Sequence, residues 1–163
     1  MKNYFKIIYI FLFLLIYPSF LLANLDGPNP TEDIKENEVL AKDNSIEFII
    51  ELINKGDYEN SKKILMEKIK DNKNDEYALN LLGYVERQLQ NYLSAINYYK
   101  AALFINNEYI AAHHYIIMAY LEIDKLDKAR EHRDYLDLLC LFGCIEFTEA
   151  NNAIKMYEAN NVR

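Results

Sequence analysis

Two cysteines and three histidines are the residues of this chain best suited to redox or metal chemistry. Cys140 and Cys144 are the only cysteines, and they lie in the sequence LLCLFGC. His113 and His114 are adjacent, and His132 follows further along the chain. Thiolates and imidazoles bind zinc and related metals, whereas two neighbouring thiols can form a disulfide. Metal binding, redox cycling and a structural crosslink are therefore the chemistries to weigh.

The spacing of Cys140 and Cys144 favours a structural crosslink. On an unbroken helix their Cα atoms would lie about 6 Å apart, near the upper end of the range that a disulfide spans. Gly143 is expected to end the helix, and a turn there brings the sulfurs together. Two buried free thiols are the alternative, because free cysteine packs as a small hydrophobe. A redox-active pair is disfavoured, because the spacing is not Cys-x-x-Cys and no basic residue is adjacent.

The histidines and the charged residues do not form a recognisable catalytic or metal-binding pattern. Adjacent residues on a helix point in different directions, so His113 and His114 are poorly placed to hold one ion together. No nucleophile–base–acid set, phosphate loop or paired-carboxylate site is visible. We therefore predict no enzymatic activity, no metal and no cofactor. The net charge of −7 without a basic patch also argues against nucleic-acid binding.

The elements that would position these side chains are helices. Only four glycines and three prolines occur among 163 residues, which suits an all-helical chain. Apolar residues in 76–109 recur at three- and four-residue intervals, which predicts two amphipathic helices joined by a tight turn. Gly83 and Ala95 are the small residues on the facing sides of these helices, so the two backbones are expected to approach closely there.

The same pattern recurs with a period of 34 residues. Ser61, Ala95 and Ala129 are spaced by this interval, and Gly56-Asp57 supplies a turn between the first two helices. A 34-residue helix–turn–helix period resembles the tetratricopeptide repeat (TPR). That resemblance implies an all-α, right-handed superhelical array of about three units plus a C-terminal capping helix. The expected units cover 44–147, at about 42–75, 76–109 and 110–143, and the capping helix with its tail covers 148–163.

The first unit departs from the repeat pattern. Ile49 stands where Gly83 stands one period later, and this bulkier residue is expected to push the two helices apart. The first helix of this unit is also apolar nearly all round, which predicts a surface that another segment covers. The preceding linker and a second copy of the chain, in a homodimer, are the candidate covers.

The N-terminal residues are expected to lie outside the repeat array. Residues 1–23 carry Lys2 and Lys6, a long apolar run and then Ala23, the layout of a secretory signal peptide. Cleavage after Ala23 would give an exported, periplasmic protein without stable membrane insertion. An uncleaved anchor in the inner membrane is the alternative, because the apolar run is near the lower limit for spanning a bilayer. Residues 24–43 are rich in acids and predict a flexible linker.

The TPR resemblance also implies a binding groove lined by the first helix of each unit. The expected groove residues in this sequence are Tyr77, Asn80, Tyr84, Arg87, Gln88, His114, Met118 and Leu121. Tyrosine and methionine suit peptide binding, because they offer apolar surface that adapts to a partner. Only Asn80 and Arg87 could hold a peptide carboxylate, so an apolar partner segment, extended or helical, is favoured.

Two hypotheses of function follow. The first is a non-catalytic adaptor of the periplasm that binds a peptide or protein segment in the groove. The run from Gly83 to Tyr157, with its histidine pair and LDLLCLFGCIEF, also resembles a group of exported bacterial repeat proteins, which supports this location. The alternative is an accessory factor for cofactor or redox-protein assembly that uses Cys140 and Cys144 as a thiol or metal-handling site.

Overall fold

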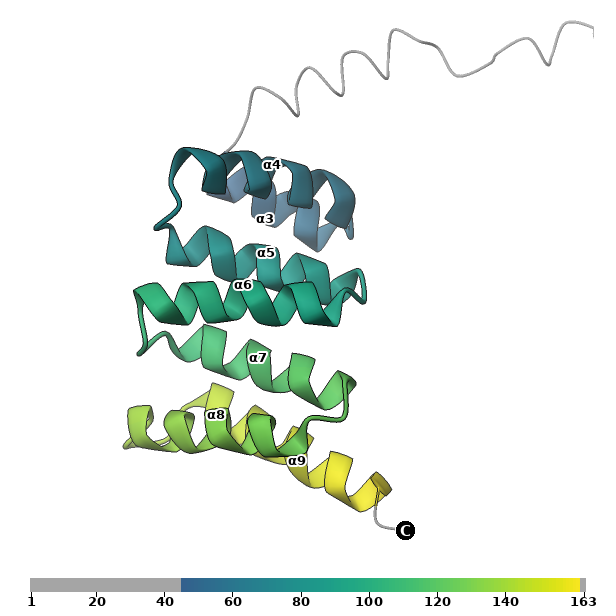
Figure 1. The fold of residues 1–163 in the computed structure, drawn as a ribbon, viewed down its shortest axis with the longest axis vertical. Helices are drawn as coiled ribbons and strands as arrows, with labels where there is room; N and C mark the ends of the chain where they lie inside the picture. The colour runs from purple at the N-terminus through teal and green to yellow at the C-terminus, as the bar shows by residue number, and fades with distance from the viewer. Residues whose placement is uncertain (1–44, 162–163) are drawn as a thin grey trace, which may run out of the picture. The chain divides into compact units, whose positions relative to one another are not determined.

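Residues 45–161 are described in a computed structural model and form seven helices without a strand (Figure 1). The expected signal peptide at 1–23 and the whole of the expected linker at 24–43 lie outside these described residues. Three helix pairs follow one another along the chain, and a long single helix ends the array. Their bounds are α3 Ile46–Asn54, α4 Tyr58–Asp71, α5 Glu76–Gln88, α6 Tyr92–Ile105, α7 Ile110–Glu122, α8 Leu126–Leu139 and α9 Ile145–Asn161.

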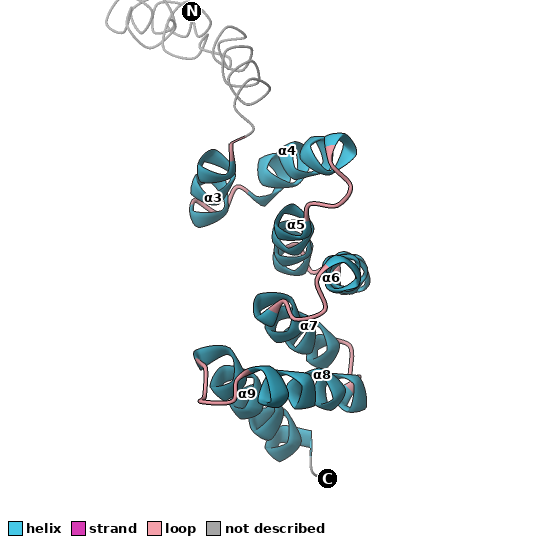
Figure 2. Cartoon of the chain, turned by 90° about the vertical axis from the view of Figure 1, so that its left-hand side faces the viewer, coloured by secondary structure: helices cyan, strands magenta, loops and turns pink. Residues whose placement is uncertain are grey.

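The helices are arranged in two layers. Figure 2 shows α3, α5 and α7 along one side and α4, α6 and α8 along the other. Each helix packs on the next one in the chain from α3 to α7, α7 packs on α8, and α9 contacts both α7 and α8. The all-α repeat array expected from the sequence is thus confirmed, with one helix pair inside each expected unit. None of the helices in 45–161 has the length and hydropathy needed to span a bilayer.

The turn inside each helix pair repeats with the same backbone geometry. Gly56, Gln90 and Asp124 are spaced 34 residues apart, and all three have positive φ angles of 79°, 62° and 57°. The residue after each one donates a backbone hydrogen bond of 2.8–2.9 Å to a carbonyl five residues earlier. This 6→1 bond and the left-handed residue define a Schellman motif, which ends a helix by satisfying its last carbonyls. The turns therefore repeat with the same 34-residue period as the helices, even where the residue with positive φ is not glycine.

Gly83 marks the closest approach of two helices in the central pair. A Cβ atom placed on Gly83 would lie only 2.6 Å from Cε1 and 2.7 Å from Cδ1 of Tyr99 on α6. Tyr99 is fully buried and its ring stacks on Tyr115 at a centroid distance of 6.1 Å. Glycine at position 83 thus makes room for the tyrosine ring, as its small size predicts.

In the first helix pair the larger of the two facing residues lies on the first helix and the smaller one on the second. Ile49 replaces Gly83, and one period before Tyr99 the chain carries Leu65. Both Ile49 and Leu65 are fully buried in the same core cluster. A larger residue on the first helix is therefore matched by a smaller one on the second, which keeps the interface filled.

The last helix begins earlier than expected. We expected the capping helix to cover 148–163, but α9 begins at Ile145. The Thr148 hydroxyl donates back to the Cys144 carbonyl at 3.2 Å, one turn inside the helix. The physical reason is the repeat itself: α5 and α7 begin at Glu76 and Ile110, and one further period places the next start beside Ile145. α9 thus occupies the place of the first helix of a fourth unit.

Candidate functional site

A pocket of about 530 Å³ lies on the side of the array formed by the first helices of the units. Three helices and one turn supply its walls. Its lining residues are Arg87 from α5, Met118, Leu121 and Glu122 from α7, Asp124 from the following turn, and Ala153, Met156 and Tyr157 from α9. The pocket therefore combines an apolar floor with two carboxylates and one guanidinium.

The repeat register explains why these side chains converge. Gln88, Glu122 and Met156 are spaced by one 34-residue period, so each stands at the same place on the first helix of its unit. Leu121 stands one period after Arg87 in the same way. Equivalent positions of stacked repeats line one continuous surface. Three of the expected groove residues, Arg87, Met118 and Leu121, share this pocket.

Aromatic side chains pack behind this surface. The rings of Tyr84 and Tyr115 meet edge to face with centroids 5.4 Å apart, and the guanidinium of Arg87 lies 5.5 Å above the Tyr84 ring. The ring of His114 lies 5.1 Å from that of Tyr115. Burial raises the pKa of the Tyr99 hydroxyl far above its usual range, and the positive charge of Arg87 opposes that rise. Tyr84, Arg87 and His114 therefore belong to one aromatic and polar cluster across α5 and α7.

Several buried polar atoms of this cluster have no hydrogen-bond partner within the described residues. They are Asn80 Oδ1, Arg87 Nε, the Tyr99 hydroxyl and His114 Nε2. Asn80 is only 3% exposed and His114 only 9% exposed. His114 Nε2 lies 3.3 Å from Glu149 Oε2 on α9, and burial lowers the pKa of His114 while this carboxylate opposes the change. Unpaired buried polar atoms cost free energy in the folded chain, and all four lie on the three consecutive helices α5, α6 and α7.

Five of the eight expected groove residues do not line the pocket: Asn80, Tyr84 and His114, described above, and also Tyr77 and Gln88. Tyr77 is 41% exposed near the start of α5, and Gln88 is half-buried at the end of that helix. Neither lines the pocket. Their side chains remain predicted groove residues on the same helix.

Sequence reasoning missed the contribution of α9. Met156 and Tyr157 line the pocket, and Met156 is 67% exposed. Extending the 34-residue period by one more unit would have placed Met156 beside Glu122 in register. We expected this helix only to cover the last apolar surface of the array. We therefore considered its polar outer face and did not compare its residues with the groove positions of the earlier units.

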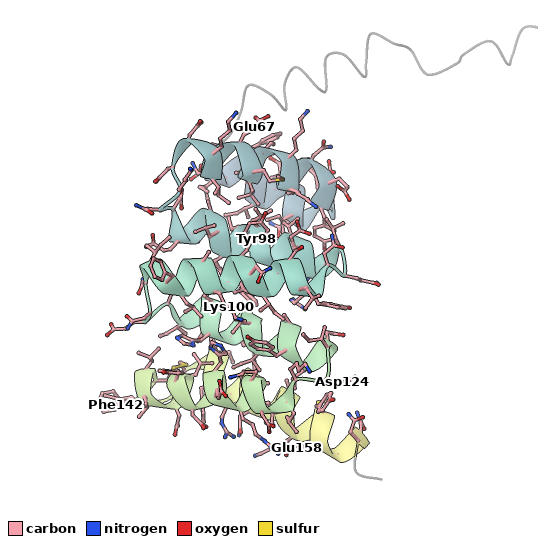
Figure 3. All side chains as sticks on the ribbon, viewed as in Figure 1. Glu67, Tyr98, Lys100, Asp124, Phe142 and Glu158 are labelled. Carbon is pink, nitrogen blue, oxygen red and sulfur yellow. A yellow bond between two sulfur atoms is a disulfide. The ribbon has the colours of Figure 1, made fainter. Side chains whose placement is uncertain are left out.

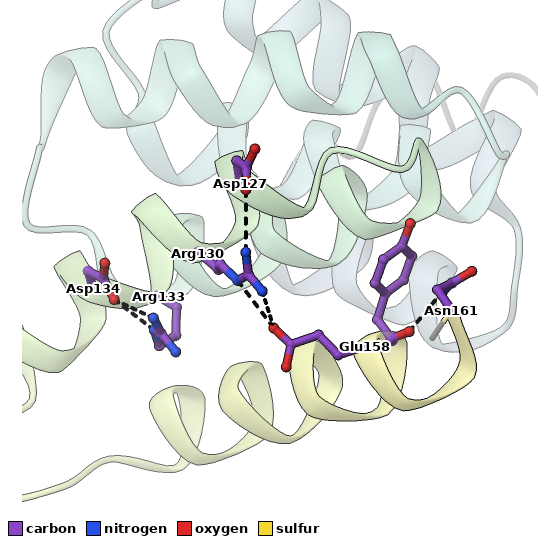
Figure 4. A network of polar contacts seen from close by, with 7 residues as sticks. Asp127, Arg130, Arg133, Asp134, Glu158 and Asn161 are labelled. Carbon is purple, nitrogen blue, oxygen red and sulfur yellow. Dashed lines mark hydrogen bonds and ion pairs between the residues drawn. The ribbon is translucent and has the colours of Figure 1, made fainter. Parts of the chain in front are cut away.

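Polar bonds fix the position of α9 and hence of this pocket wall. The Tyr157 hydroxyl donates to Asp124 Oδ1 at 2.6 Å. Figure 4 shows Arg130 of α8 reaching Glu158, with Nη2 and Oε1 2.6 Å apart, while its Nη1 lies 3.4 Å from Asp127. The C-terminal half of α9 is therefore tied both to the α7–α8 turn and to α8.

The other two histidines form a hydrogen-bonded pair behind the first-helix layer. His113 Nε2 lies 2.9 Å from the Asn107 carbonyl oxygen, which can only accept, so this nitrogen carries the proton. His113 Nδ1 lies 3.0 Å from His132 Nδ1. In the neutral pair His113 Nδ1 accepts and His132 Nδ1 donates. The His132 ring also stacks on Tyr120, with centroids 5.8 Å apart.

The surroundings of this pair disfavour protonation. Burial lowers the pKa of His132 to about 4, and the neighbouring His113, Lys100 and Lys128 act in the same direction, whereas Glu131 opposes them. Burial also lowers the pKa of His113, partly offset by its bond to the backbone. Both rings are therefore neutral at pH 7. No cluster of three or more metal-ligating side chains occurs among residues 45–161.

Cys140 and Cys144 meet at the turn between α8 and α9. Their sulfurs lie 2.10 Å apart and their Cα atoms 5.5 Å apart, so the structure joins them as a disulfide. We expected Gly143 to end the helix, but α8 already ends at Leu139, before both cysteines, because Cys140 leaves the helical conformation as its C-terminal cap. Gly143, with φ of 82°, forms the turn that lies between the cysteines. Leu141 and Phe142 inside this small loop are exposed, and Figure 3 shows Phe142 at the edge of the molecule.

Comparison with known proteins agrees with this architecture. No protein-family model and no curated protein matches the chain. Among solved structures, the first TPR of Spaghetti (RPAP3) bound to the HSP90 peptide SRMEEVD superposes with a TM-score of 0.64 at 14% identity, over 72% of this chain and 90% of that one. PcrH in complex with the chaperone binding region of PopD also gives 0.64, at 16% identity, over 83% of this chain and 98% of that one.

A third structure is the second TPR domain of human RPAP3 in complex with the HSP70 peptide SGPTIEEVD. It matches with a TM-score of 0.63 at 17% identity, over 72% of this chain and 97% of that one. The class that these likenesses and the two-layered helix pairs define is the α-helical repeat array. More particularly, the chain has the fold of a tetratricopeptide-repeat domain, as its 34-residue period predicted.

Proposed function

We propose that this protein is a non-catalytic adaptor that binds a peptide or protein segment on its first-helix layer. The pocket between α5, α7 and α9 carries the proposal, because Met118, Leu121 and the largely exposed Met156 offer adaptable apolar surface in one hollow. Structures of the same fold hold peptides, which supports this use of the layer.

An apolar partner segment suits the pocket better than a peptide carboxylate. Arg87 is the cation of the pocket, and its guanidinium is already held over Tyr84. Glu122 and Asp124 lie on the same wall and would repel a second carboxylate. A segment that inserts leucine-like or aromatic side chains between Met118 and Met156 matches this lining.

Site-specific photocrosslinking in the native cell envelope tests the proposal. A photoreactive residue at Met156 should capture a partner, whereas one at Leu93 on α6 should not. These positions are matched controls, because their side chains are 67% and 69% exposed but lie on opposite layers. Equal capture from both positions, or capture only from Leu93, would refute the groove as the binding surface.

We further propose that the adaptor works in the periplasm after cleavage behind Ala23. The Lys-flanked apolar segment at the N-terminus and the Cys140–Cys144 disulfide support export, because disulfides persist in oxidising compartments. N-terminal sequencing of the exported protein should give Asn24. Recovery of intact Met1 in the membrane fraction would favour the anchored alternative instead.

One observation keeps the assembly-factor alternative in view. The Cys140–Cys144 bond closes a small exposed loop, where another thiol could reach it. Repeated reduction and reoxidation during a cofactor-assembly reaction, or stoichiometric metal binding by the reduced pair, would support this alternative. A single, permanently oxidised state supports the adaptor.

A further inference from the structure

The two layers of the array differ sharply in charge. The helices of the first-helix layer carry eight acids and only two bases: Glu47, Glu51, Glu76, Glu86, Glu122, Glu146, Glu149 and Glu158, against Arg87 and Lys155. The helices of the second layer are nearly balanced, with seven acids and eight bases: Glu59, Glu67, Asp71, Asp127, Glu131, Asp134 and Asp137, against Lys62, Lys63, Lys68, Lys70, Lys100, Lys128, Arg130 and Arg133. Among the helices, the excess of acidic residues thus lies on the first-helix layer, whose helices also line the pocket.

Part of this charge is neutralised inside the domain. Glu86 pairs with Lys62 at 3.0 Å, and Glu158 pairs with Arg130 at 2.6 Å. The carboxylates at the pocket differ, because within 45–161 no basic side chain forms an ion pair with Glu122 or Asp124. Both residues are exposed. Two uncompensated negative charges therefore stand beside the apolar floor.

The single cation of the pocket does not cancel them. Arg87 has its guanidinium 5.5 Å above the Tyr84 ring, and its charge acts on the buried Tyr99 hydroxyl behind the surface. Its Nε is buried. The pocket consequently presents apolar side chains together with two carboxylates that have no cationic partner.

We propose that the partner is a cationic amphipathic segment, with apolar side chains entering between Met118 and Met156 and a Lys or Arg paired with Glu122 and Asp124. This inference rests on the groove function proposed above and adds the charge of the partner to it. Charge complementarity selects the partner and speeds its encounter, while the apolar contacts supply most of the affinity.

Peptide binding to the purified protein tests separately whether the partner is cationic and whether it binds in the groove. The probes are three short fluorescent peptides with leucine at the same apolar positions and only Lys, only Glu or only Gln between them. By fluorescence anisotropy, we expect the Lys peptide to bind about tenfold more tightly than the Glu peptide. Added salt should narrow this difference, because exposed charges are screened.

Variants that remove the pocket charges make the test specific. Glu122→Gln combined with Asp124→Asn should reduce the preference for Lys to about threefold or less, because the paired carboxylates are gone. Asparagine accepts the bond from Tyr157 and tolerates the positive φ of residue 124. The matched control is Glu67→Gln combined with Asp71→Asn, which also removes two negative charges, from exposed positions of α4 (Figure 3 labels Glu67), and should leave the preference unchanged. If the double variant unfolds, Glu122→Gln alone gives the same comparison.

An uncharged substitution at Met156 in the pocket distinguishes failure of the cationic partner from failure of the groove function. Met156→Gln keeps the length of the side chain and should weaken all three peptides. Equal binding of the Lys and Glu peptides, with both weakened by Met156→Gln, would overturn the cationic partner and leave the groove function standing. Binding that Met156→Gln does not affect would overturn both.

Discussion

Adding one methyl group at Gly83 should destabilise the domain, although alanine favours helices over glycine. The new Cβ would lie 2.6 Å from Tyr99 Cε1, about 1 Å inside a normal carbon–carbon contact. Tyr99 is fully buried and stacks on Tyr115, so its ring has no free direction in which to move. Overpacking of this kind costs about 1–3 kcal/mol, and a rigid neighbour places the cost in the upper part of that range.

Helix propensity offsets part of this cost. Replacing glycine by alanine inside a helix contributes about 1 kcal/mol of stability. For Gly83→Ala we therefore expect a net loss of about 1–2 kcal/mol in the free energy of unfolding. Gly83→Leu should lose more than any change on an exposed face. Urea unfolding followed by circular dichroism measures both, and Ser94→Leu on the exposed face of α6 is the control, expected within about 0.5 kcal/mol of the wild type.

A second substitution, Tyr99→Leu, should change the effect of Gly83→Ala on stability from destabilising to stabilising. Tyr99→Leu copies the first unit, where Leu65 faces the place of Ile49, and it removes the ring that the new methyl group would strike. In the Tyr99→Leu background, Gly83→Ala should become stabilising by up to about 1 kcal/mol, because only the helix propensity remains. A loss of stability from Gly83→Ala that is the same in both backgrounds would refute the contact with Tyr99 as its cause.

Three further outcomes follow from the structure. Gln90→Gly should raise the free energy of unfolding by about 0.5–1 kcal/mol, because Gln90 adopts a φ of 62° that glycine adopts without strain; an unchanged urea midpoint would contradict this. Stability should fall as the pH falls from 6.5 towards 4, because His113 and His132 bind protons in the unfolded chain before they do so in the folded one. The loss is on the order of 1–2 kcal/mol, and a His132→Gln variant should show a smaller difference in unfolding free energy between pH 7 and pH 5, because only the His113 contribution of the pair remains. An undiminished difference would contradict this. Replacing Cys140 and Cys144 by serine should lower stability but leave partner binding largely intact, and two alkylatable thiols in freshly isolated protein would rule the bridge out.

The sequence predicted the repeat and the central pair of helices because those features are local and periodic. The apolar spacing in 76–109 and the small residue at Gly83 both report the same helix interface. The turns show that residue type alone does not identify every position with a positive φ angle. Gly56 signals its positive φ, whereas Gln90 and Asp124 take the same conformation without glycine, because the packing of their helices fixes the turn.

Contacts between distant parts of the chain could not be predicted from the sequence in the same way. Glu86 is almost fully buried in α5 because Lys62 of α4 and the Asn91 side chain pair with it, at 3.0 Å and 2.8 Å. Nothing in the local sequence distinguishes this buried carboxylate from an exposed one. The bond between His113 and His132, 19 residues apart, is likewise a product of helix packing. Such polar pairs depend on the register between helices, which the hydrophobic pattern alone does not specify.

The position of α9 connects the disulfide to the pocket and explains why its loss should spare binding. The disulfide precedes Ile145, at the N-terminal end of α9, whereas Met156 lies in the C-terminal half of the helix. That half has its own attachments, because Tyr157 bonds to Asp124 and Glu158 pairs with Arg130. Ile154 is also buried in the core cluster that joins α6 to α9. Removing the crosslink therefore frees the turn at Leu141 and Phe142, while packing and polar bonds still hold the pocket wall in place.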